Sequence, residues 1–305
     1  VAVAAALILT QGLSAGGIVD LDLSMYLAGR FNWAGAVLGG LLFGAGMVYA
    51  GGCASRNLIR AGCGDVRALL TVLCVAITAY ATISGVFGPA RAAVEDATAV
   101  SGGLAGSSMR YALPDVFAAA GTGQPLARII ATALLAVPLL AFAVVRGSVL
   151  SSPVNLFAGL GVGVLVTAGW LVTGLAYDEM MLRPVSPHSL SFVRPIADAI
   201  DWLQRSTALG LPGFGAASVF GVLLGSALAA RLAGQFRISG FSDAQDLKRH
   251  LLGACAMGAG GVLALGCSIG QGITGVSTLS LQSLLAAASI FAGAWMARVR
   301  LERDA

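Results

Sequence analysis

Long uncharged, apolar runs alternate along the chain with short segments that carry nearly all of its charge. The runs cover residues 1–19, 31–55, 68–90, 129–145, 147–177, 206–230 and 251–297. Because about 20 apolar residues cross the hydrocarbon core of a bilayer as an α-helix, each of the first six runs predicts one membrane span. The last run is long enough for two. The pattern therefore predicts an all-α, polytopic membrane protein with eight spans in one transmembrane domain over residues 1–305.

The composition supports this prediction, and the distribution of charge indicates how the protein is oriented in the membrane. Hydrophobic residues make up 57% of the 305, charged residues only 10%, and the mean hydropathy is +0.88. A soluble globule could not bury that much apolar surface. With both termini cytoplasmic, eleven cations and five acids lie inside (+6), and seven cations and nine acids lie outside (−2), which gives the net charge of +4. This positive excess inside favours that orientation.

A glycine-framed cysteine motif occurs twice. Residues 44–53 (GAGMVYAGGC) align without a gap with residues 258–267 (GAGGVLALGC) at an offset of 214, and most positions are identical. In the predicted topology the span before Cys53 runs inward and the span before Cys267 runs outward. The chain is therefore expected to contain two inverted halves, about 31–150 and 206–305. Inverted repeats with glycine-interrupted segments are typical of transporters, although small-residue motifs also recur in membrane helices because they let backbones approach.

The repeated cysteines are the strongest candidates for ligand contact. A thiol is a soft, weak hydrogen-bond donor, so two thiols suit a ligand that presents a soft atom such as sulfur. If short helices follow Cys53 and Cys267, their free N–H groups attract an anion. The other three cysteines, Cys63, Cys74 and Cys255, are interpreted as packing residues. The candidate binding residues are Cys53, Cys267, Gly52, Gly266, Asn57, Gln271 and Arg56.

Two of these candidates follow from their spacing to the cysteines, and a third, Arg56, follows from its spacing to Arg60. Asn57 and Gln271 each lie four residues after a cysteine and are expected to line a polar path. Arg56 lies four residues before Arg60 and shares its helical face, where the pair either draws anions toward Cys53 or anchors the cytoplasmic end.

Residues 268–283 are polar but uncharged, which is unusual for a loop in water. We expect this stretch to re-enter the membrane and face a cavity.

Other chemistries find no support in the sequence. Lys248 is the only lysine and no Walker A motif surrounds it, so the chain is not itself an ATP-driven pump. The two histidines, His188 and His250, and the absence of a CxxC motif give no basis for a metal site or a resident cofactor. No basic, aromatic patch suggests nucleic acid. We therefore predict a protein that is not an enzyme.

The motifs resemble the YeeE/YedE family of sulfur-compound transporters. Residues 51–60 (GGCASRNLIR) and 257–272 (MGAGGVLALGCSIGQG) carry the likeness, and residues 191–195, 221–225 and 277–279 also resemble the family pattern. The resemblance spans most of the chain after about residue 33. It implies a helical bundle whose broken or re-entrant helices meet at a central constriction lined by reduced cysteines, here Cys53 and Cys267.

The resemblance also implies a function. The family is associated with thiosulfate uptake across the bacterial inner membrane, in which the anion passes between thiols by hydrogen bonding, without a covalent intermediate. It further implies a TusA-like sulfurtransferase as a partner. Family members usually carry one more cysteine in an early Phe-Cys segment, and none precedes Cys53 here. Either a segment with that cysteine lies before Val1, or this member lacks that step.

Three alternatives remain open from the sequence alone. The cargo could be a selenium compound or another small anion instead of thiosulfate. A membrane thiol–disulfide oxidoreductase would form and break a disulfide between Cys53 and Cys267, and thiol labelling before and after an oxidant distinguishes it from a transporter. A scaffold without transport predicts that cysteine substitutions have no effect.

Overall fold

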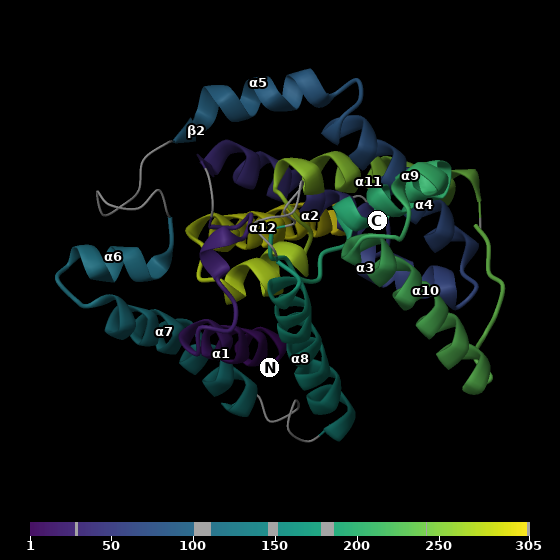
Figure 1. Cartoon of the computed structure of the whole chain (residues 1–305). Helices are drawn as coiled ribbons and strands as arrows, with labels where there is room; N and C mark the ends of the chain where they lie inside the picture. The colour runs from purple at the N-terminus through teal and green to yellow at the C-terminus, as the bar shows by residue number, and fades with distance from the viewer. Residues whose placement is uncertain (28–29, 101–110, 146–151, 178–185, 242, 304–305) are drawn as a thin grey trace. The chain divides into compact units, whose positions relative to one another are not determined.

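Helices account for nearly all regular structure in the computed structural model, which describes residues 1–27, 30–100, 111–145, 152–177, 186–241 and 243–303 (Figure 1). The α-helices in chain order are α1 (Ala2–Ala15), α2 (Gly40–Tyr49), α3 (Ala54–Gly62), α4 (Val66–Ile83), α5 (Gly88–Thr98), α6 (Leu113–Ala119), α7 (Gln124–Val145), α8 (Pro153–Leu175), α9 (Val193–Leu209), α10 (Phe214–Leu232), α11 (Ala244–Leu263) and α12 (Leu281–Arg303). Shorter elements are the 3₁₀ turn η1 (Leu21–Leu23), the π-helical segments η2 (Gly35–Gly39) and η3 (Gly270–Gly275), and an antiparallel pair of two-residue strands, β1 (Phe31–Asn32) and β2 (Ala99–Val100).

Six helical segments among the described residues are long and apolar enough to cross a membrane. They are Gly35–Gly62, Val66–Ile83, Gln124–Val145, Pro153–Leu175, Phe214–Leu232 and Leu281–Arg303. The prediction of a helical, polytopic membrane protein is therefore confirmed. The other two predicted spans correspond to α1, which has only 14 residues, and to α11, whose first turns carry charged residues. Those two spans stay predictions.

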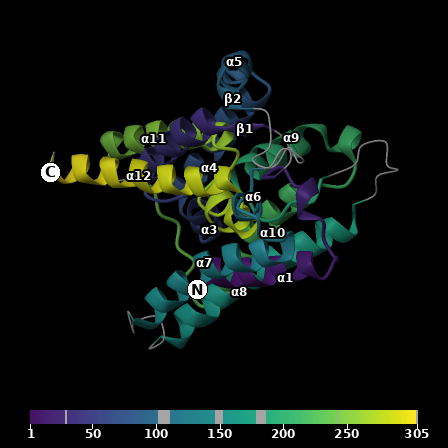
Figure 2. The ribbon, with the colours of Figure 1, turned by 90° about the vertical axis from the view of Figure 1, so that its left-hand side faces the viewer.

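The chain divides into two compact units. The first contains residues 1–32, 99–190 and 270–284. Its helices α1, α7 and α8 lie side by side, with α6 against α7 (Figures 1 and 2). The fully buried Trp170 of α8 meets the ring of Tyr26 edge-on, and its indole N–H donates to the hydroxyl of Ser277 at 3.3 Å. An apolar core closed by an aromatic side chain with a satisfied N–H organises this unit.

The second unit contains residues 33–98, 191–269 and 285–305. Helix α11 packs against α2, α4 and α9, while α10 packs against α3 and α9. One apolar cluster fills the unit; its largest fully buried members include Phe43, Leu58, Ile196 and Met257. All of the first cysteine motif, and the second through Cys267, belong to this unit.

Helices α2 and α11 pack antiparallel through small residues. At Gly46, an added Cβ atom would lie 2.6 Å from the carbonyl oxygen of Gly253; at Gly260, it would lie 2.7 Å from the carbonyl oxygen of Gly39. Only glycine permits this approach of two backbones. With the offset of 214, Gly39 corresponds to Gly253, and Gly46 corresponds to Gly260. The contact between Gly46 and Gly253 is thus repeated as the contact between Gly260 and Gly39.

The reciprocity extends one turn further. A Cβ atom at Gly39 would lie 2.5 Å from the backbone nitrogen of Ala264, and one at Gly253 would lie 2.6 Å from the backbone nitrogen of Ala50. Ala50 and Ala264 are themselves related by 214 residues. In an isologous interface, each contact between two residues is repeated between the counterparts of those residues, as across a two-fold axis. The two helices that lead to the cysteines therefore meet in a pseudo-symmetric pair.

Candidate functional site

Helix α2 ends in a Schellman motif just before Cys53. The N–H of Gly52 donates to the carbonyl of Met47 at 2.9 Å, and the N–H of Gly51 donates to the carbonyl of Val48 at 3.4 Å. Gly51 has φ of 68°, the left-handed conformation that this motif requires and that glycine adopts without a steric cost. Consequently, the membrane-length segment Gly35–Gly62 is broken at this turn, and Cys53 follows the break.

Helix α11 ends in the same way before Cys267. The N–H of Gly266 donates to the carbonyl of Gly261 at 2.8 Å, and the N–H of Leu265 donates to the carbonyl of Val262 at 3.0 Å. Leu265 has φ of 57°, although a leucine in this region carries a steric cost of about 1 kcal/mol. Each bond is shifted by 214 residues from its counterpart in the first motif. The repeated sequence therefore folds twice into one local geometry, which places Gly52 and Gly266 in matching positions.

Cys53 lies at the N-cap position of α3 and is half-buried. Its sulfur lies 3.2 Å from the hydroxyl oxygen of Ser55, and the thiol makes no capping bond to the helix. The first backbone N–H groups of an α-helix have no intrahelical acceptor, so the N–H groups that follow Cys53 carry partial positive charge next to the thiol. The condition considered from the sequence, a short helix after the cysteine, is therefore met at Cys53, whereas Cys267 is followed by two turn residues and then by the π-helical segment η3.

The Asn57 side chain is fully buried and stabilises the turn around Cys53 through hydrogen bonds. Its amide nitrogen lies 2.8 Å from the carbonyl oxygen of Gly52, 3.2 Å from that of Cys53 and 3.4 Å from that of Ala50. Its own amide oxygen is buried without a hydrogen-bond partner among the described residues. One amide group thus binds three carbonyl groups. The carbonyl of Cys53 also accepts from the backbone N–H of Asn57 at 3.0 Å, whereas those of Ala50 and Gly52 would otherwise have to find other donors or water.

The two arginines of α3 have different surroundings. Arg60 is tied to Asp65 through its Nε atom at 3.0 Å and through an ion pair with the same carboxylate. Arg56 is exposed, and among the described residues it forms no ion pair. The aliphatic part of its side chain covers Gly52, with Cδ 2.9 Å from the position of an added Cβ atom. Of the two, Arg56 is therefore the cation whose charge is not neutralised close to Cys53.

Asp65 lies in the turn between α3 and α4, immediately before α4 begins. Its carboxylate accepts from the backbone N–H groups of Arg67 at 3.0 Å and Ala68 at 3.4 Å, which caps α4, and it also pairs with Arg60. Burial raises the pKa of this carboxyl, but the hydrogen bonds and charges of Arg60 and Arg67 outweigh burial and hold the pKa below its usual value. The charged form therefore stabilises the folded state.

We expect the substitution Asp65→Asn to lower the free energy of unfolding by about 1 kcal/mol at neutral pH, because the amide oxygen of asparagine still caps α4 but the ion pair with Arg60 is lost. A carboxyl with a lowered folded-state pKa contributes its full stabilisation above the unfolded pKa of about 3.9 and loses it as the pH falls through the folded pKa. Thermal unfolding in detergent at pH 7 and pH 3.5 measures this. The difference between the variant and the wild type should shrink at the lower pH; an equal difference at both would contradict the account.

Cys267 is fully buried, in contrast to Cys53. It belongs to the apolar cluster of its unit, and Cys53 packs against the same cluster. All five cysteines of the chain are thiols in the structure. The site thus places two reduced thiols, one half-buried and one fully buried, in one apolar surrounding, with the hydroxyl of the buried Ser55 beside the first.

Gln271 lies in the other unit, within η3. It is fully buried, as is its counterpart by offset, Asn57. Most hydroxyl groups of the polar stretch that follows donate to nearby carbonyls: Thr274 to Leu190 at 2.6 Å, Thr278 to Gly275 at 2.7 Å. The stretch is therefore buried in protein, as expected of irregular backbone at membrane depth. Contact of Gln271 with a ligand stays a prediction.

Two features of the site escaped sequence reasoning. The approach of Ser55 to Cys53 could have been noticed because the two are separated by one residue at the start of a helix. The neutralisation of Arg60 by Asp65 requires the turn between α3 and α4 and has no clear sequence signal. Its consequence is that Arg56 and Arg60, although four residues apart, are not equivalent sources of charge.

Comparisons with known proteins agree with the geometry. The profile of the family described as "Sulphur transport" matches residues 1–296. The chain is 29% identical over 265 residues to a protein of Spirochaeta thermophila named thiosulfate transporter TsuA, a match that covers 87% of this chain and 76% of that protein. It is 27% identical over 297 residues to the Escherichia coli protein of the same name, with 94% of this chain and 80% of that protein covered.

Proposed function

Because the chain belongs to the sulphur transport family, we propose that it imports thiosulfate or a similar small sulfur-containing anion across the bacterial inner membrane. The names of its relatives support this cargo. In the proposed mechanism Cys53 and Cys267 line a constriction and hand the anion from one thiol to the other by hydrogen bonds. A TusA-like sulfurtransferase that receives the sulfur belongs to this proposal through the family resemblance alone.

The observation that carries the proposal is the shared geometry of the two cysteine turns. Each turn ends a helix of an isologous pair with the same two hydrogen bonds, and each leads through a glycine to a thiol. Buried cysteine is common as packing material. A chance packing residue, however, has no reason to recur at the same position of a duplicated turn. The duplication supports a pair of equivalent binding positions, one in each inverted half.

The chemistry of the thiols suits thiosulfate better than sulfate. The terminal sulfur of thiosulfate is large and polarisable, and a weak, polarisable S–H donor loses little when it leaves water to meet such an acceptor. Sulfate offers only oxygen atoms, which are strongly hydrated and prefer stronger donors. A protonated thiol also avoids the repulsion between a thiolate and a dianion. The step requires no electron transfer and no covalent bond between the cysteines and the cargo.

The backbone around Cys53 provides the remaining attraction. The first N–H groups of α3 follow the thiol directly, and Arg56, whose aliphatic part covers Gly52, adds a positive charge in the same turn; both favour an anion. Asn57 contributes indirectly, because it binds the carbonyl groups of Ala50, Gly52 and Cys53, whose negative ends would repel a dianion. We therefore assign Asn57 a positioning role.

This role gives a distinct prediction for the substitution Asn57→Leu, which keeps the volume of the side chain and removes its donors. The carbonyl groups of Ala50 and Gly52 then lose this donor, which costs about 1 to 3 kcal/mol of folding stability. Thiosulfate uptake per folded molecule should fall about tenfold, because a loss of 1.4 kcal/mol of interaction changes a rate or affinity by that factor. The substitution Asn57→Gln, which retains an amide, should recover part of the uptake. Stability loss with unchanged uptake per folded molecule would contradict the positioning role.

Uptake of radiolabelled thiosulfate tests the function itself. The host cells lack their own thiosulfate and sulfate importers and express either this chain or an empty vector. We expect uptake that depends on the chain. An inserted, folded protein that gives no uptake of thiosulfate would contradict the proposed cargo, and labelled sulfite and selenite in the same cells would then test the alternative anions.

A further inference from the structure

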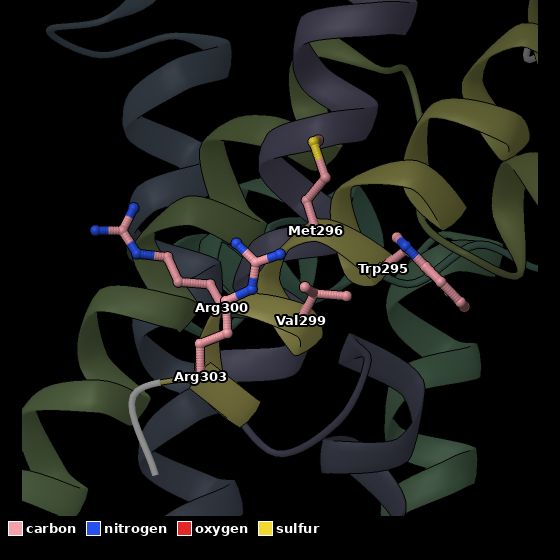
Figure 3. A pocket seen from close by; sticks show the side chains of 5 residues that line it. All are labelled: Trp295, Met296, Val299, Arg300 and Arg303. Atoms are coloured by element: carbon pink, nitrogen blue, oxygen red, sulfur yellow. The ribbon is translucent and has the colours of Figure 1, made fainter.

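A second cluster of cationic side chains lies at the C-terminal end of α12, away from either cysteine motif in the sequence. An open-sided hollow of about 490 Å³ is lined by Trp295, Met296, Val299, Arg300 and Arg303. In the view of Figure 3 the two arginines extend from the end of the helix, and Val299 lies between them and the indole of Trp295. All five residues belong to one unit, so the hollow is complete within it.

Among residues up to 303 that the structure describes, no acidic side chain pairs with the arginines of the hollow. Arg298, in the same turns, forms an ion pair with Glu302 at 2.8 Å. Among the described residues, neither Arg300 nor Arg303 forms an ion pair or a hydrogen bond. Two guanidinium groups, three residues apart on one helix, therefore face outward together. A fork of donors of this kind matches a phosphate group.

The opposite part of the lining is apolar and aromatic. Trp295 is 62% exposed and Met296 is 55% exposed. Helix α12 has 23 residues, which gives a length of about 34 Å, enough to cross a hydrocarbon core of about 30 Å. Its last turn therefore lies at the level of the lipid headgroups, where tryptophan is enriched and arginine extends toward phosphate. The apolar side chains lie one turn deeper.

We propose that this hollow binds an anionic phospholipid, with the phosphate between Arg300 and Arg303 and an acyl chain along Met296, Val299 and Trp295. The arrangement offers both parts of such a ligand: paired cations at headgroup depth and an apolar surface next to them, on a helix that crosses the membrane. The phosphate of a membrane lipid, rather than free phosphate, is the occupant because only the lipid also covers the exposed aromatic and thioether groups. Basic pockets on the cytoplasmic side of membrane proteins bind anionic headgroups in this way.

Native mass spectrometry of the purified full chain tests this site. The protein in detergent is titrated with phosphatidylglycerol or with phosphatidylcholine of the same acyl chains, and retained lipids are counted. Wild-type protein should retain phosphatidylglycerol in preference to phosphatidylcholine. The double substitution Arg300→Gln and Arg303→Gln should weaken phosphatidylglycerol binding on the order of tenfold. The control, Arg298→Gln with Glu302→Gln, also removes two charged side chains from these turns but leaves the net charge unchanged, and it should bind within about twofold of wild type.

Three results would overturn the proposal. The first is equal retention of both lipids by the wild type, which needs no variant and so stands even if a variant folds poorly. The second is an equal loss of binding in the test and control variants, which would indicate a general effect of charged residues at this helix end. The third is displacement of phosphatidylglycerol by millimolar inorganic phosphate, which would assign the arginines to a free anion. The site is independent of the cargo, so failure of thiosulfate transport would leave it unaffected.

Discussion

Replacement of Cys267 by serine is expected to lower thiosulfate uptake at least tenfold, with a similar loss for Cys53→Ser. Serine keeps a donor of nearly the same size, but its hydroxyl is a harder group that pairs poorly with a terminal sulfur atom. A loss of about 1.4 kcal/mol in one relay step already accounts for a tenfold change. Cys63, whose sulfur lies 3.8 Å from the carbonyl oxygen of Ser226, provides the control: Cys63→Ser should transport within about twofold of wild type.

The comparison requires that the variants fold. A hydroxyl buried in the apolar cluster at position 267 costs stability, so Cys267→Ala, which adds no polar group, is measured beside it. Uptake is normalised to the folded protein in the membrane, quantified by gel filtration with a fluorescent fusion. Normal uptake by both single serine variants would refute a relay between thiols, whereas equal loss in all three cysteine variants, Cys63→Ser included, would point to a general structural effect.

The second large effect is expected at the interface of α2 and α11. Gly260→Ala places a methyl group 2.7 Å from the carbonyl oxygen of Gly39, and Gly46→Ala places one 2.6 Å from the carbonyl oxygen of Gly253. Backbone atoms cannot move aside cheaply, and overpacking of this kind costs about 1 to 3 kcal/mol. Because the two contacts are counterparts across the pseudo-two-fold, the losses in thermal stability should be similar.

Gly225→Ala in α10 is the matched control. An added Cβ atom at Gly225 meets nothing within 4 Å, and alanine favours a helix over glycine by up to about 1 kcal/mol. Thermal unfolding in detergent should therefore show this variant at or above the stability of the wild type. If Gly46→Ala were strongly destabilising and Gly260→Ala neutral, the isologous arrangement of the two helices would be contradicted.

The sequence alone predicted the features that occur twice along the chain and the features that depend on long apolar runs. The offset of 214 identified two corresponding turns, and the structure ends α2 at Tyr49 and α11 at Leu263, which are 214 residues apart. The glycine pair at 51 and 52 predicts a break after α2. The break after α11 is different, because Leu265 adopts the left-handed conformation against its own preference. Only comparison with the first motif indicates that turn.

Hydrogen bonds between a polar side chain and a neighbouring turn were harder to predict from the sequence. Sequence spacing predicts that Asn57 lines a polar path, which stays a prediction; the hydrogen bonds of its amide to three carbonyl groups of the preceding turn have no sequence signal. Gln271, at the same spacing after Cys267, is also buried, and its place along the path likewise stays a prediction. Spacing along a helix reports which residues share a face. It does not report whether their donors are already used, since that depends on where the neighbouring turn ends.

Sulfate competition in proteoliposomes tests the central claim, selection of a soft sulfur atom by thiols, most directly. Purified protein is reconstituted, and the initial rate of thiosulfate entry is measured with and without a hundredfold excess of sulfate. The account predicts a nearly unchanged rate, because sulfate lacks the terminal sulfur that the thiols of Cys53 and Cys267 recognise. Suppression of thiosulfate entry in proportion to the added sulfate would show that charge and size alone govern entry and would contradict selection by the thiols.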